Sequence, residues 1–140
     1  MAAYQKFATF AQDFLVGLHN FEADTFNIML TQVLPNAALD NEYSDITEIT
    51  PQHGYVAGGK TIPNVQMNQV GMETIILGDS IVFTADGGIM GPFQYAVMYN
   101  ASQAQKRLVA YWGYPTQLTL MDTETITIKF NPVDGIFKVV

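Results

Sequence analysis

The 140-residue chain contains no cysteine, which excludes disulfide bonds and thiolate metal sites. It also lacks a long hydrophobic run. Hydrophobic residues make up 49% of the chain, yet no apolar stretch approaches the roughly 18–20 residues that span a bilayer. The N-terminal sequence MAAYQKFATFAQDF mixes polar with apolar residues and does not resemble a secretory signal peptide. We therefore expect a soluble protein that is made in a cytoplasm, is not exported by a signal peptide and does not bind a membrane.

Basic residues are scarce. Six lysines and arginines stand against 13 acidic residues, giving a formal charge of −7, and only Lys106 and Arg107 are adjacent bases. An acidic surface repels a phosphate backbone, so we expect no nucleic-acid partner. Charged residues make up only 14% of the chain. The large neutral surface that remains suits a protein that packs against other protein, although many globular domains share it.

The length fits one domain, residues 1–140. An amphipathic α-helix is predicted over about residues 3–18, because Tyr4, Phe7, Ala11, Phe14 and Leu18 recur at spacings of three and four. Gly17 then supplies a stop signal. Such a helix lies across a sheet of its own subunit or docks on a partner.

From residue 25 onward the period changes from that of a helix to that of strands. The stretch TFNIML (residues 25–30) alternates as a half-buried strand. Residues 34–64 are irregular, broken by Pro35, Pro51 and Pro63, with a helical turn expected at SDITEIT (44–50). Strands follow at about 65–69, 73–77, 80–84, 93–99, 107–113, 117–121, 125–130 and 135–139. The predicted fold class is mainly β: an antiparallel β-sandwich or jelly-roll-like barrel with one N-terminal amphipathic α-helix.

The glycine-rich stretch GGIMG (87–91) raises the question of a phosphate-binding loop. Such a loop needs a helix after it, whose N-terminal amides meet the phosphate. Here Pro92 follows, and then a strand pattern in which Phe93, Tyr95, Val97 and Tyr99 are expected to share one face. The stretch is therefore interpreted as a tight corner in a sheet, with positive φ supplied by Gly87 and Gly88.

Polar residues that carry chemistry form no recognisable constellation. His19 and His53 lie far apart, and no serine sits in a nucleophile elbow. His19 is expected to finish the helix and His53 to lie in a turn. The acidic cluster Asp40, Glu42, Asp45 and Glu48 is a solvated loop, a cation site or a patch for a basic partner. The sequence thus predicts no enzyme, no catalytic residue, no cofactor and no metal.

Aromatic residues are the strongest candidates for contact with a partner. Tyrosine and tryptophan combine a large apolar area with a polar tip, which favours interfaces and carbohydrate platforms as well as cores. In a strand, Tyr111 and Trp112 must point to opposite faces, one towards the core and the other towards solvent or a partner. The candidate interface residues are Phe7, Phe10, Phe14, Tyr43, Tyr55, Tyr111, Trp112 and Tyr114.

Several segments together resemble small virion structural proteins of tailed bacteriophages. They are YQKFATFAQDFLVGLHN, DTFNIML, DITEITPQHGYVAGG, VFTADGGIMGPFQYAVMYN, LVAYWGYPTQLTL and ETITIKFNPVDGIFKVV, which cover nearly the whole chain. The most specific pieces are HGYVAGG and GGIMGPFQYAVMYN. The resemblance implies a capsid decoration (cement) protein on the outer surface of the head, with the major capsid protein and further copies of itself, as a dimer or trimer, as partners.

Two alternatives stay open at this point. Tail-tube and head–tail connector proteins use similar small β-domains, so the resemblance says more about fold than about position in the particle. A carbohydrate-binding β-sandwich would use Tyr111, Trp112 or Tyr114 as an exposed platform.

Overall fold

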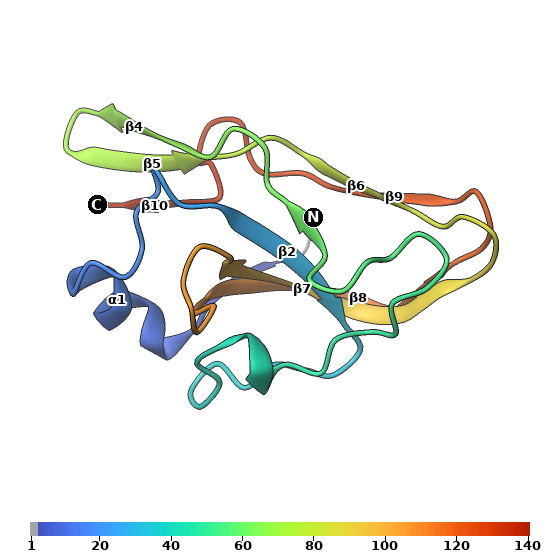
Figure 1. Cartoon of the computed structure of the whole chain (residues 1–140). Coiled ribbons are helices and arrows are strands. Elements are labelled where there is room, and N and C mark those ends of the chain that lie inside the picture. Colours follow the sequence, from blue (N-terminus) through green and yellow to red (C-terminus); the bar gives the residue numbers. More distant parts are fainter. Residues whose placement is uncertain (1–2) are drawn as a thin grey trace.

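A computed structural model, which describes residues 3–140, shows an antiparallel β-sandwich with one short N-terminal helix (Figure 1). The predicted fold class is confirmed, in its sandwich form. One layer is a five-stranded sheet in the order β1 (Ala3–Lys6), β8 (Leu108–Leu120), β7 (Met90–Asn100), β2 (Phe26–Thr31) and β3 (Lys60–Thr61). The other layer holds the three strands β10 (Phe137–Val139), β5 (Glu73–Leu77) and β4 (Gln66–Val70), and the pair β6 (Ile81–Thr84) and β9 (Thr125–Ile128). The helices are α1 (Ala8–Leu15) and a single 3₁₀ turn, η1 (Tyr43–Asp45).

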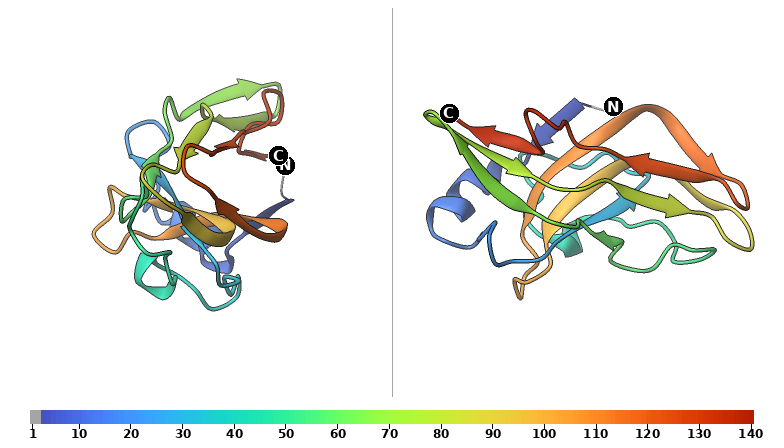
Figure 2. Two further views of the ribbon diagram at one scale, coloured as in Figure 1. Left: turned by 90° about the vertical axis from the view of Figure 1, so that its right-hand side faces the viewer. Right: turned by 90° about the horizontal axis from the view of Figure 1, so that it is seen from above.

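The main core lies between the two layers, which are seen end-on in Figure 2. Alternate residues of the long strands point inwards, so that Ile28, Met98 and Trp112 face Ile76 and Phe83 of the opposite layer. Of the strands predicted from residue 65 onward, β4, β5, β6, β9 and β10 have both ends within two residues of the prediction, whereas β7 begins three residues earlier than predicted, at Met90.

The five-stranded sheet is buried on its second face as well. A smaller cluster of Phe7, Met29, Val97, Tyr99 and Leu108 lies there, under Tyr43 and Ile46 of the irregular segment. The prediction that TFNIML is half-buried is therefore wrong, because β2 packs on both faces. The irregular segment is found where it was predicted. Its one helical turn, η1, occupies residues 43–45, at the start of the stretch 44–50 for which a helical turn was predicted.

The predicted helix over 3–18 is wrong in its first part. Residues 3–6 form β1, which pairs with β8 so that Tyr4 lies opposite Trp112. Phe7 is extended (φ −75°, ψ 144°), and the helix occupies only residues 8–15. A spacing of three fits one face of a helix, but in an extended chain it places Tyr4 and Phe7 on opposite faces, where Tyr4 contacts Trp112 and Phe7 joins the smaller cluster. The open edge of β8 gives this short segment a ladder to join.

The end of α1 is built as the sequence predicted. Gly17 adopts φ +86°, the Leu18 N–H donates to Asp13 O (2.9 Å), and the Gly17 N–H donates to Phe14 O (3.1 Å). This is a Schellman motif, which satisfies the last carbonyls of the helix and needs a left-handed residue at the glycine position. His19, expected to finish the helix, lies beyond this stop and is buried.

Two predicted strands, 107–113 and 117–121, are one continuous strand, β8. Between Phe93 and Tyr95 of β7 the partner residue on β8 changes from Leu118 to Gly113, so β8 bulges there. Pro115 lies in this bulge, where its missing N–H leaves no ladder bond unmade. β7 is irregular at the same place: Phe93 and Ala96, three residues apart, both enter the main core, while Tyr95, Val97 and Tyr99 point to the other face. The prediction that all four share one face is therefore wrong.

The structure predicts that two substitutions on α1 differ strongly in their effect on the free energy of unfolding. Phe10 is 5% exposed and packs against Phe14, Phe21 and Phe137, so Phe10→Ala should lower the free energy of unfolding by about 3 kcal/mol or more. Leu15 is 84% exposed, so Leu15→Ala should change it by less than about 0.5 kcal/mol. Urea denaturation of both variants checks this. Equal effects would contradict the assignment of the buried face of α1.

Candidate functional site

The glycine-rich stretch is a corner between strands. Gly87 has φ +83°, and β7 rather than a helix begins at Met90. A Cβ on Gly88 would lie 2.7 Å from the His53 ring, so Gly88 is needed for close approach rather than for positive φ. His53 lies in a turn, as predicted, with Nδ1 2.9 Å from Ile89 O. The glycine-rich stretch therefore allows the turn at residue 53 to pack closely against the start of β7.

Glu48 holds the irregular segment over the second face of the large sheet. Its carboxylate accepts hydrogen bonds from the hydroxyls of Tyr43 and Tyr55 and from the Gly58 N–H (2.7 Å). The Tyr55 hydroxyl lies 3.0 Å from the Leu30 N–H of β2, and the Tyr99 hydroxyl donates to Gly58 O (2.6 Å). Burial, together with the Glu48 carboxylate, raises the pKa of Tyr43 and of Tyr55. Both phenols are therefore neutral donors at physiological pH.

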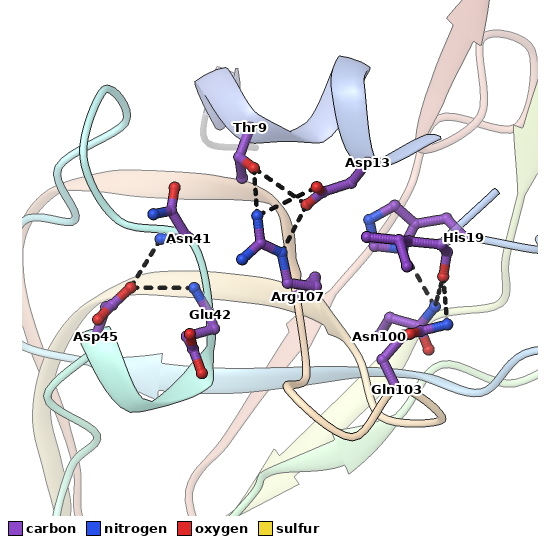
Figure 3. Close-up of polar contacts among 10 residues, drawn as sticks. Thr9, Asp13, His19, Asn41, Glu42, Asp45, Asn100, Gln103 and Arg107 are labelled. Carbon is purple, nitrogen blue, oxygen red and sulfur yellow. Dashed lines mark hydrogen bonds and ion pairs between the residues drawn. The ribbon is translucent and has the colours of Figure 1, made fainter. Parts of the chain in front are cut away.

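The other acidic residues of the predicted cluster each satisfy local backbone amides. Asp45 Oδ2 accepts from the N–H groups of Asn41 (2.9 Å) and Glu42 (3.2 Å), as Figure 3 shows. Asp40 Oδ2 accepts from the Asn36 N–H (2.7 Å). The four carboxylates therefore stabilise turns instead of converging on one point. Within residues 3–140, no three histidine, aspartate or glutamate side chains gather closely enough to hold a metal ion.

Arg107 connects the beginning of β8 to α1 (Figure 3). Its Nε donates to Asp13 Oδ2 (2.8 Å), and its Nη2 donates to Asp13 Oδ1 (3.1 Å) and Thr9 Oγ1 (2.7 Å). Asp13 is buried, so this bidentate pair is shielded from solvent on the carboxylate side. Arg107, one of the two adjacent basic residues in the sequence, therefore pairs with a carboxylate of its own subunit.

His19 is buried beside Asn100 (Figure 3). The Asn100 side-chain oxygen accepts from the Ser102 N–H (3.0 Å), so its amide NH₂ faces Asp24 Oδ2 (2.8 Å) and His19 Nδ1 (3.1 Å). Nδ1 must therefore accept, which places the proton of the neutral ring on Nε2.

The Nε2 side of His19 faces aromatic rings instead of an acceptor. Nε2 has no hydrogen-bond partner within the described residues, and the rings of Phe10, Phe21 and Phe26 lie with their centroids 5.5–6.2 Å from that of His19. Burial lowers the pKa of His19 below its ordinary 6.5, against an opposing pull from Asp13 and Asp24.

An apolar groove of about 490 Å³ lies between α1, β1 and β10. Its walls are Tyr4, Phe10, Phe14 and Phe137, and Lys6 and Lys138 stand among its lining residues. Tyr4 stacks on Phe137 (centroids 6.1 Å apart), which joins the edge strands of the two layers. This groove has the apolar lining typical of a binding surface.

The predicted interface residues divide into three groups. Phe7, Phe10, Tyr55 and Trp112 are buried in the subunit, so the folded subunit does not expose them as the prediction requires, although Phe10 still lines the groove. Phe14 is half-buried and lines the groove. Tyr43, Tyr111 and Tyr114 are half-buried elsewhere. Tyr111 and Trp112 do point to opposite faces, as predicted.

Sequence reasoning missed the groove residues Tyr4, Lys6, Phe137 and Lys138. No local pattern could reveal them, because residues 4 and 137 meet only through the sandwich. It also missed the tip of the β4–β5 hairpin, Val70-Gly71-Met72, although two exposed apolar residues around a turn glycine are a readable signal. None of the helices within residues 3–140 has the length and apolar composition of a bilayer-spanning helix.

Glu48→Gln should lower the free energy of unfolding by about 2 kcal/mol, because an amide replaces a carboxylate that accepts three hydrogen bonds. Glu22→Gln is the matched control: it removes the same charge from an exposed side chain for which no hydrogen bond is found within residues 3–140, and it should change stability by less than about 0.5 kcal/mol. Chemical denaturation checks both, and equal effects would contradict the role of Glu48.

The lowered pKa of His19 predicts a loss of stability in mild acid. The folded state binds the proton less readily than the unfolded state, so this contribution is complete above about pH 6.5 and is lost as the pH falls towards the lowered folded pKa. Wild type should lose up to about 1.4 kcal/mol per pH unit in that window from this group. His19→Phe should show a smaller slope in the same denaturation series. An unchanged slope would contradict the assignment.

Comparison of the chain with protein-family models, with curated proteins and with solved structures finds no match. What the protein does is therefore inferred from its own residues, contacts and surface.

Proposed function

We propose that this protein is a structural component of a tailed-bacteriophage virion, most specifically a capsid decoration protein on the outer surface of the head. It would bind the assembled lattice of the major capsid protein and stabilise contacts between capsid subunits. The resemblance of several segments to small virion structural proteins supports this proposal. The observation that carries it further is an apolar surface on a segment that the fold holds rigidly.

That surface, the shell-facing patch, consists of Val33, Leu34 and Leu39. All three are more than half exposed, and Leu39 reaches 72%. Three apolar side chains in seven residues of exposed loop are unusual, because connecting segments of this kind normally carry polar residues. Leu34 and Leu39 belong to the irregular segment 34–64, and Val33 directly precedes it.

The backbone beneath the shell-facing patch is well anchored. The Asn36 side chain accepts from the N–H groups of Ala38 (3.1 Å) and Leu39 (3.2 Å), and Ala37 O accepts from the Ala8 N–H at the start of α1 (2.7 Å). A loop fixed in this way presents its apolar side chains without a large loss of entropy on binding.

The distribution of polar groups also favours a structural role. Glu48, Asp13 and Arg107 are each engaged in contacts that hold one element to another. A ligand that binds only the closed, assembled lattice adds its binding free energy to that state by linkage. A stiff sandwich with apolar contact surfaces meets that requirement.

The test is co-sedimentation of the purified protein with expanded and with unexpanded shells of the parent phage. Wild type should be retained by expanded shells, and Leu39→Glu should bind at least about tenfold more weakly because it places a charge in the contact. Val56→Glu, at a position of similar exposure (69%) on the loop 51–59, is the matched control and should bind like wild type.

Three outcomes would contradict the proposal. Wild type fails to bind either kind of shell, Leu39→Glu binds as well as Val56→Glu, or the protein alone assembles into rings. Rings would favour the tail-tube or connector alternative.

A further inference from the structure

One end of the molecule gathers exposed apolar side chains from three parts of the chain. Figure 1 shows α1, the C-terminus and the tip of the β4–β5 hairpin together at that end, and the view from above in Figure 2 agrees. The pairing of β10 with β5, in which Val139 lies opposite Thr74, fixes this arrangement. Its exposed apolar residues, which we call the apolar end, are Leu15, Val16, Val70, Met72, Val139 and Val140.

The apolar end contains both a projection and a hollow. The projection is the hairpin tip Val70-Gly71-Met72, where Met72 is 97% exposed. The hollow is the groove of about 490 Å³ whose lining includes Phe14, Leu15 and Val139. Because the tip and the groove lie side by side on one subunit, a two-fold axis between them can place each tip in the groove of the other copy.

Charge distinguishes this end from the rest of the surface. The chain has a formal charge of −7, yet the exposed residues of α1 are Ala8, Ala11, Gln12 and Leu15, and β4 reads Gln-Met-Asn-Gln-Val. Glu73 is paired with Lys138 (3.5 Å), and burial raises the pKa of the Tyr4 phenol to about 12, so it is neutral.

The remaining charge in the groove is positive. Lys6 lines the groove, and no ion pair is found for it within residues 3–140. Two copies of an acidic protein repel each other over most of their surfaces. At this end the Glu73 carboxylate is paired with Lys138, and the exposed Glu22, which lines a hollow beside β4, is a carboxylate that the contact must accommodate. The occupant that this surface fits is therefore another copy of the same chain.

We propose that the protein forms a two-fold symmetric dimer through the apolar end, with the Val70–Met72 tip of each copy seated in the groove of the other. The exposed edge strand β4 and the exposed C-terminal valine are covered in the same contact. The accessible surface of one subunit is 7388 Å², so a dimer interface of standard size needs about 800 Å², roughly a tenth of it. Capping one end of the sandwich with α1, β10 and the hairpin is compatible with that requirement.

This inference rests on the proposed function in one respect only: it specifies the self-association that the resemblance to virion proteins implies. It uses the apolar end, whereas the shell contact uses Val33, Leu34 and Leu39. Loss of the dimer and loss of shell binding are therefore separate results: a monomer that still binds shells would overturn the dimer alone, and a dimer that binds no shell would overturn the capsid proposal alone.

The dimer is tested by sedimentation velocity from about 1 to about 100 µM. Wild type should be dimeric, whereas Met72→Glu and Leu15→Glu should each weaken dimerisation by at least about tenfold. Both side chains are exposed, so the subunit fold should survive, which circular dichroism and a melting curve check. Val56→Glu adds the same charge on the loop 51–59, away from α1 (Figure 1), and should remain dimeric.

Cross-linking gives a second test, since the chain has no cysteine of its own. Met72→Cys protein mixed with Leu15→Cys protein and treated with a short bis-maleimide should yield a linked pair containing one of each. The proposal is overturned if wild type stays monomeric, if rings or open chains form, if the two glutamate variants dimerise like Val56→Glu, or if Met72→Cys links only to itself.

Discussion

The five-stranded sheet must be covered on both faces, and most of the structure follows from that requirement. Its central strands place Ile28 and Met98 on one face and Met29 and Val97 on the other, all fully buried. Leaving either face in water would expose several large apolar side chains, each worth about 1.5–3 kcal/mol when buried. The second layer of strands covers one face, and the irregular segment between β2 and β3, together with Phe7, covers the other.

An irregular segment has no ladder of its own, so it needs other hydrogen bonds to stay in place. The Thr31 hydroxyl donates to Thr47 O (2.5 Å), and the Ile49 N–H donates to Leu30 O (3.1 Å). The Glu48 carboxylate accepts hydrogen bonds from two tyrosine hydroxyls and one backbone N–H. These contacts all lie along β2 or next to it. The acidic residues of this segment therefore serve the fold, and the loop that they fix carries apolar side chains outwards, the reverse of the usual arrangement.

The sequence was informative wherever local signals suffice. Alternation and turn residues placed β4, β5 and β6, and Gly17 placed the end of α1, because these features depend on neighbours in the chain. Residues 3–6 were misassigned because four residues fit either period, and the choice is made by a strand more than a hundred residues away. The β7–β8 bulge is invisible for the same reason: register between two strands is a property of the pair.

The candidate surfaces illustrate the same limit. Aromatic content drew attention to Phe14, which lines the groove, but it equally indicated Phe7 and Trp112, whose burial depends on how the layers meet.

The β4–β5 hairpin carries the exposed surface on which the proposed dimer rests. All five residues of β4 are exposed, its outer edge pairs with no strand of residues 3–140, and the hairpin tip carries Val70 and Met72. Proteins that remain monomeric protect such an edge with lysines, proline or a bulge, since unpaired strands promote aggregation. Here β4 contains none of these within Gln66–Val70. An unprotected, uncharged edge on an otherwise acidic chain is compatible with solubility when a specific contact covers it. The groove beside the hairpin is an apolar surface of the same chain, and in the proposed dimer it covers the apolar hairpin tip of the other copy.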